Sequence, residues 1–163
     1  MTTIEEVARQ PLAQRLARIE RTPDDLAAAI RGRSEAALSR RPDAKNWAAK
    51  EILCHLRDTE ELYAVRAQTM LVMEDPTFLR ADPDRWAAER QYLRNDAAEA
   101  LAAFRVRRQE SLDFFKKLSP ADLQRSCTHP AYGRITIDQI VGLLAWHDDN
   151  HLDQLKRALD GKA

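Results

Sequence analysis

Apolar side chains recur along most of the chain at spacings of three, four, seven or eight residues. This is the period expected of helices that bury one face. We expect a break or kink in the first of these helices at Thr22-Pro23, because Thr22 can cap a new start and Pro23 suits a first helical position. The pattern predicts four long helices, over residues 4–31, 47–73, 83–118 and 136–159, and short helical turns near residues 34–40 and 119–122.

The third helix is the longest of the four and should bury one continuous stripe. The members of this stripe are Trp86, Leu93, Ala97, Leu101, Phe104, Leu112, Phe115 and Leu118.

The connections carry signals for helix ends. Asn46 can cap the second long helix, and Thr136 with Gln139 three residues later forms a capping box for the last one, which Gly161 ends. The stretch before that last helix, up to residue 135, contains Pro and Gly and is predicted to be irregular or extended. The fold class is therefore all-α, a four-helix bundle with a long crossover before the last helix.

Composition agrees with a helical protein and narrows its partners. The 163 residues suit a single domain over 1–163 and include only 4 glycines and 7 prolines. Lys plus Arg (26) equals Asp plus Glu (26), so no net charge attracts nucleic acid or an anionic membrane surface. No apolar run approaches the ~20 residues of a membrane span, and the two cysteines lack paired spacing. We expect a cytoplasmic protein without nucleic-acid or membrane partners.

Three of the four histidines fall on faces that should point into the bundle. His147 and His151 are four residues apart, so they lie one turn apart and within about 40° of each other on the last helix. They continue the apolar stripe of Leu144 and Leu155. The second long helix carries His55 on its own inward stripe.

Imidazoles among apolar neighbours need polar partners, because an unpaired buried polar group costs a few kcal/mol. His55, His147 and His151 can meet this need together by binding one divalent metal ion, which would leave a position open for water or substrate. The alternative is a cluster of hydrogen-bonded core histidines. A zinc-protease helix would need Glu where Asp148 stands, and a di-iron bundle would need Glu-x-x-His pairs, so both fit less well.

Other polar side chains have two interpretations each. Glu51 could orient the His55 ring or could stabilise the start of its helix, and Asp148 could orient His147, act as a base or be an exposed charge. Arg66 shares the His55 stripe but lies about 16 Å along the axis. It could bind a substrate carboxylate at the far end of a pocket, or it could be an ordinary salt-bridged arginine.

The remaining candidates are predicted to be structural. His129, beside Pro130, is expected to be a surface or loop-anchoring residue, with closure over the site as the alternative. The arginines of the third helix, including Arg105, Arg107 and Arg108, are offset by acidic residues and are predicted to form solvated helix surface.

Three segments together resemble the DinB/YfiT-like family. They read NWAAKEILCHL at 46–56, HPAYGRIT at 129–136, and HD with HLDQ at 147–154. The resemblance spans nearly the whole chain and implies a four-helix bundle with a divalent metal held by His55, His147 and His151. One departure is Ala48, where family members often have Ser or Thr; this position concerns a helix cap.

The resemblance also bounds the chemistry. Some family members use the metal to activate a low-molecular-weight thiol, such as bacillithiol or mycothiol, and others are named metal-dependent hydrolases. We therefore expect zinc or nickel, ahead of manganese or iron, with a thiol as a candidate cofactor. The expected partners are a small electrophilic substrate and a second copy of the chain in a homodimer. The alternative is a non-catalytic bundle that binds a metal or ligand in a stress response.

Overall fold

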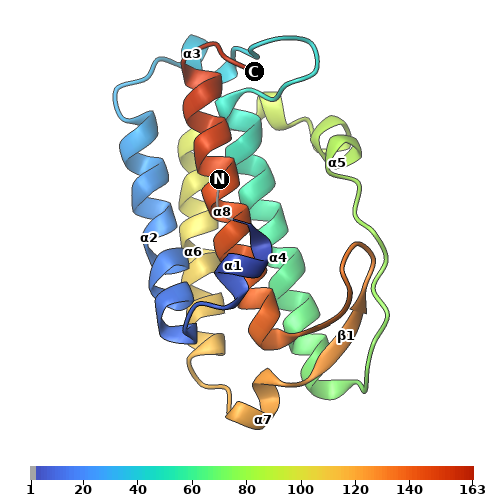
Figure 1. Ribbon diagram of the computed structural model, residues 1–163. Helices are drawn as coiled ribbons and strands as arrows, with labels where there is room; N and C mark the ends of the chain where they lie inside the picture. Colours follow the sequence, from blue (N-terminus) through green and yellow to red (C-terminus); the bar gives the residue numbers. More distant parts are fainter. Residues whose placement is uncertain (1–2) are drawn as a thin grey trace.

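Four long helices run side by side in the computed structural model, which describes residues 3–163 (Figure 1). Helices α4 and α2 each contact both α6 and α8, so the four close into a bundle around one interior. This confirms the predicted four-helix bundle. The long helices are α2 (Leu12–Ile30), α4 (Ala49–Val72), α6 (Ala97–Phe115) and α8 (Ile137–Leu159).

Short elements connect and cover the bundle. The crossover before α8 folds into an antiparallel hairpin, in which Ser126 pairs with Thr136 and His129 with Gly133. Gly133 starts the second strand at φ +68°, a conformation that favours glycine. The segment predicted to be irregular or extended is thus a small two-stranded sheet. The short elements are α1 (Ile4–Ala8), α3 (Glu35–Ser39), α5 (Pro83–Glu89), η1 (Tyr92–Arg94), α7 (Pro120–Leu123), β1 (Ser126–His129) and β2 (Gly133–Thr136).

The helix break predicted at Thr22-Pro23 is wrong. The first helix is interrupted earlier, between Ala8 and Leu12, and α2 continues through Pro23. A proline removes the hydrogen bond to the carbonyl four residues earlier, which here belongs to Ile19. Arg108 of α6 replaces that bond, since its Nη1 donates to Ile19 O at 2.8 Å. Thr22 does not cap a helix; its hydroxyl donates to Asp148 at 2.5 Å in the interior.

The third helix is also interrupted, between α5 and α6. Gln91 adopts a left-handed conformation at φ +50°, and Asp96 starts α6 by accepting a hydrogen bond from the Glu99 N–H at 2.8 Å. The interruption changes which side chain enters the core. Leu93, expected on the buried stripe, is 39% exposed, whereas Tyr92 is fully buried.

The sequence predicted the ends of α8 correctly but the start of α4 incorrectly. Thr136 and Gln139 form the predicted capping box, and Gly161 follows the end of α8 at φ +71°. The predicted cap Asn46 is wrong, because Ala48 occupies the cap position of α4. Alanine has no side-chain acceptor, so only the Glu51 half of a capping box forms: its carboxylate accepts from the Ala48 N–H at 2.9 Å.

One close packing position attaches the short N-terminal helix to the bundle. A Cβ at Gly142 of α8 would lie 3.2 Å from the Cα of Ala8, so glycine lets α1 lie against α8. Figure 1 shows α1 crossing in front of α8. Within the described part of the chain, no helix is long and apolar enough to cross a membrane.

Candidate metal centre

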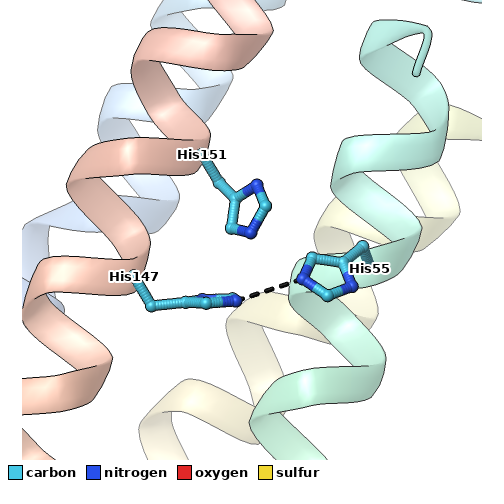
Figure 2. A group of neighbouring side chains, drawn as sticks. All are labelled: His55, His147 and His151. Atoms are coloured by element: carbon cyan, nitrogen blue, oxygen red, sulfur yellow. Dashed lines mark hydrogen bonds between the residues drawn. The ribbon is translucent and has the colours of Figure 1, made fainter. Parts of the chain in front are cut away.

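Three imidazoles from two helices meet in the interior of the bundle. His55 comes from α4, and His147 and His151 come from α8 (Figure 2). One ring nitrogen of each lies within 4.8 Å of the other two, and His55 Nε2 is 3.1 Å from His147 Nε2. His55 is buried and the other two are partly buried. The three histidines predicted from helical spacing therefore form one cluster.

The spacing of these nitrogens fits a small divalent cation. A tetrahedral zinc ion with Zn–N bonds of about 2.0–2.1 Å holds its ligand nitrogens about 3.3 Å apart. The 3.1 Å separation of the His55 and His147 nitrogens is close to this value. The ring nitrogen of His151 lies within 4.8 Å of both, so a small movement of its ring would bring it to the same distance. Three imidazoles suit zinc, nickel and iron(II).

Neighbouring polar groups orient the rings. Nδ1 of His151 donates to Gln154 Oε1 at 2.7 Å, which leaves the Nε2 lone pair free to face the cluster. Thr59 Oγ1 lies 3.4 Å from both ring nitrogens of His55, and the Trp47 ring packs against the same imidazole at 4.9 Å. The role of Gln154 was not predicted from the sequence, although its position three residues after His151 on one helix face indicates such a contact.

Burial keeps the three imidazoles neutral. Desolvation, with a smaller contribution from His151, lowers the pKa of His55 to about 3. Desolvation also lowers the pKa of His147 well below its usual value, with added effects from the other two imidazoles. The pKa of His151 is lowered by burial as well, against an opposing contribution from Gln154. The neutral ring is the form that binds metals.

We expect the metal-free protein to lose stability as the pH falls below about 6.5, the pKa of histidine in an unfolded chain. Between that value and the folded pKa of His55, about 3, the unfolded chain binds more protons than the folded one. Each buried neutral histidine then removes up to about 1.4 kcal/mol of unfolding free energy per pH unit. Urea denaturation at about pH 7.5 and pH 5.5 measures this loss.

The matched control for this pH effect is His55→Gln, which removes one titrating group from the cluster. Its unfolding free energy should fall less steeply over the same pH interval than that of the wild type. Equal slopes would mean that the folded protein protonates His55 as readily as the unfolded chain.

Glu51, a candidate for orienting His55, lies at the start of α4. Its oxygens accept hydrogen bonds from the Ala48 N–H at 2.9 Å and from Arg41 at 2.7 and 2.5 Å. These bonds serve the helix end, which is the alternative role that the sequence allowed.

Asp148, the second candidate, is fully buried, so the interpretation as an exposed charge is wrong. Its carboxylate accepts hydrogen bonds from Arg108 at 2.5 and 3.1 Å. Arg108 also pairs with Glu60 at 2.6 Å and is 1% exposed, so the expectation that Arg108 is solvated surface is wrong too. Asp148 acts on the cluster through its charge, which offsets a small part of the lowering of the His151 pKa by burial.

A cavity of about 230 Å³ opens at the cluster and is lined by His55 and His147, so a small molecule can reach these two imidazoles. His129 lines this cavity and is only 6% exposed, which corrects the expectation of a surface residue. Its Nδ1 accepts from the Ala131 N–H at 3.2 Å, so it also anchors the hairpin turn. The wall includes His55, His147, Tyr63, Arg66, Trp86, His129 and Tyr132.

Known proteins resemble this chain in sequence and in fold. A protein of Oceanobacillus iheyensis named "putative metal-dependent hydrolase" is 28% identical over 107 residues, which are 65% of this chain and 61% of that protein. A second protein with this name from the same organism is 24% identical over 98% of this chain and 91% of its own length. The chain thus spans about three fifths of the first relative and most of the second.

The structure of YfiT from Bacillus subtilis superposes with a TM-score of 0.85 at 19% identity, covering 92% of this chain and 86% of that one. YfiT is described as "a probable metal-dependent hydrolase with an unusual four-helix bundle topology". The sequence profile of the DinB superfamily matches residues 18–155, which include all three clustered histidines. The chain belongs to the DinB superfamily.

Proposed function

We propose that this protein is a metal-dependent enzyme in which His55, His147 and His151 hold a divalent ion that acts on a small electrophilic substrate. One observation carries the proposal: three neutral imidazoles have nitrogens within 4.8 Å of one another, and two of them, His55 and His147, line a cavity. The names of the two Oceanobacillus relatives and the description of YfiT support it.

The chain's own residues supply the geometry for this chemistry. His55, His147 and His151 would hold a divalent ion, which would supply a positive charge able to lower the pKa of a water or thiol near neutral pH. Gln154 fixes the His151 ring in the tautomer that presents Nε2 to the cluster. The aromatic side chains of Tyr63, Trp86 and Tyr132 give the cavity apolar walls that suit the body of a small organic substrate.

Two nucleophiles are compatible with this site. Water gives hydrolysis, which the names of the relatives favour. A low-molecular-weight thiol gives S-transfer, which the likeness of the three sequence segments to the DinB/YfiT-like family favours. Both reactions require the same three ligands and a substrate bound in the same cavity.

The test uses the protein reconstituted with zinc or with nickel and two reporter substrates. A nitrophenyl ester reports hydrolysis, and monochlorobimane with added cysteine or bacillithiol reports S-transfer. We expect turnover of one reporter to depend on the metal and to disappear in His147→Ala. The matched control is Lys156→Ala, an exposed position on the same helix, which should keep wild-type turnover.

Stoichiometric metal binding without metal-dependent turnover of either reporter would contradict the enzymatic proposal. It would instead favour a non-catalytic metal-binding bundle.

A further inference from the structure

Arg66 brings a buried positive charge to the cavity without an acidic partner among residues 3–163. Its residue exposure is 5%. Nη2 donates to Leu79 O at 2.8 Å, and the guanidinium lies over the rings of Tyr63 and Phe78, 5.3 Å from each centroid. A buried charge without a counter-ion costs several kcal/mol. The two other buried arginines of the described residues have acidic partners: Arg15 pairs with Asp138, and Arg108 pairs with two carboxylates.

The contact between Arg66 and His129 does not satisfy the guanidinium. The Ala131 N–H donates to Nδ1 of His129, so a neutral ring carries its proton on Nε2, where it can donate to Tyr63 Oη at 3.2 Å. His129 is neutral at pH 7, since burial and the charge of Arg66 lower its pKa to about 4. Nη1 of Arg66, 3.1 Å from Nε2, therefore faces a donor. The acceptors left to the guanidinium are the backbone oxygen of Leu79 and the hydroxyl oxygen of Tyr63, and neither carries a charge at pH 7.

The charges around the cavity have one sign. Arg66 and Arg80 both line it, whereas its described lining contains no Asp or Glu. Two guanidinium groups beside aromatic walls create a positive potential that attracts anions. A carboxylate matches the planar fork of an arginine and can accept two parallel hydrogen bonds from it.

We propose that Arg66 binds a carboxylate of the substrate, at the end of the cavity away from the three imidazoles. Arg66 follows His55 by eleven residues on α4, which is about 16 Å along the helix axis, and both side chains line the same cavity. The substrate class is thus a small organic acid with an apolar or aromatic body, whose electrophilic centre lies apart from its carboxylate. This assignment rests on the proposed function only in taking the ligand to be the substrate.

The test measures binding to the metal-free full-length protein, so that its outcome is independent of the metal centre. The probes are phenylacetate and its neutral analogue phenylacetamide, compared by calorimetry or ligand-observed NMR at millimolar concentration. We expect phenylacetate to bind about tenfold more tightly, the effect of one hydrogen bond to a charged group. In Arg66→Met this preference should vanish.

Two further variants separate binding from structure. Arg80→Met removes the exposed guanidinium of the same cavity and should retain most of the preference. Arg66→Met should keep or raise the melting temperature, because it removes an uncompensated buried charge. If Arg66→Met does not fold, Arg66→Lys replaces it and should bind phenylacetate more weakly than the wild type, since it lacks the fork.

Equal affinity for acid and amide in the wild type, no binding of either, or a preference retained without Arg66 would overturn the assignment. Because the metal is absent from this experiment, a protein that shows the preference yet takes up no metal would refute the proposed function and leave the carboxylate site standing.

Discussion

The variant Arg108→Met should lower the free energy of unfolding by roughly 3–5 kcal/mol, as expected when one member of a buried ion pair is removed. The guanidinium pairs with Asp148 at 2.5 Å and with Glu60 at 2.6 Å, and all three side chains are nearly inaccessible to water. The variant would leave two buried carboxylates uncompensated. It would also leave Ile19 O without the donor that replaces the bond missing at Pro23. Urea denaturation measures the change.

The matched control is Arg105→Met, one turn earlier on α6. Arg105 is 49% exposed on its side chain and pairs with Asp24, which is 76% exposed. Its loss should change the free energy of unfolding by less than about 1 kcal/mol. A cost for Arg108→Met as small as that of the control would contradict the description of Arg108 as the buried counter-ion of Asp148 and Glu60.

Zinc should stabilise the folded protein by about 2.7 kcal/mol when its free concentration is one hundred times the dissociation constant. The reason is that the three imidazoles are assembled only in the folded chain, where their nitrogens lie within 4.8 Å. The stabilisation appears as a rise in melting temperature that a chelator reverses. In His147→Ala the rise should be lost.

The control for the zinc effect is again Lys156→Ala, which leaves the cluster intact and should show the wild-type rise. A zinc-dependent rise of the same size in His147→Ala would place the ion elsewhere on the protein.

Helical periodicity was sufficient to predict the bundle and to predict that His55, His147 and His151 lie on inward faces. A spacing of four residues on α8 places two imidazoles one turn apart, whatever the details of packing. The third imidazole, His55, lies on α4, so its contact with the other two depends on how the helices pack in the bundle. In the structure this packing places His55 Nε2 3.1 Å from His147 Nε2.

The interruption before α6 could not be predicted from periodicity. Gln91 takes a left-handed conformation, although glutamine carries no turn preference of its own. This bend rotates the chain so that Tyr92, instead of Leu93, enters the core. The Tyr92 hydroxyl then donates to Asp58 at 2.8 Å, a tertiary contact that stabilises the bend.

The buried charges were equally inaccessible to sequence reasoning. Charged residues on amphipathic helices are usually exposed to solvent. For this reason Arg108 and Asp148 were expected on the surface, whereas both are buried. Their burial depends on a relation between three helices: Pro23 of α2 leaves the Ile19 carbonyl without its helical donor, and Arg108 replaces it while pairing with Asp148 of α8. Local sequence does not encode this relation.

The most direct test of the metal centre is the metal content of the untagged purified protein, measured by mass spectrometry beside the triple variant His55→Ala, His147→Ala, His151→Ala. We expect about one divalent ion per chain in the wild type, the stoichiometry of a single three-ligand site, and none in the variant. A wild-type protein that contains no metal, and takes up none of zinc, nickel, manganese or iron(II) at micromolar concentration, would contradict this expectation.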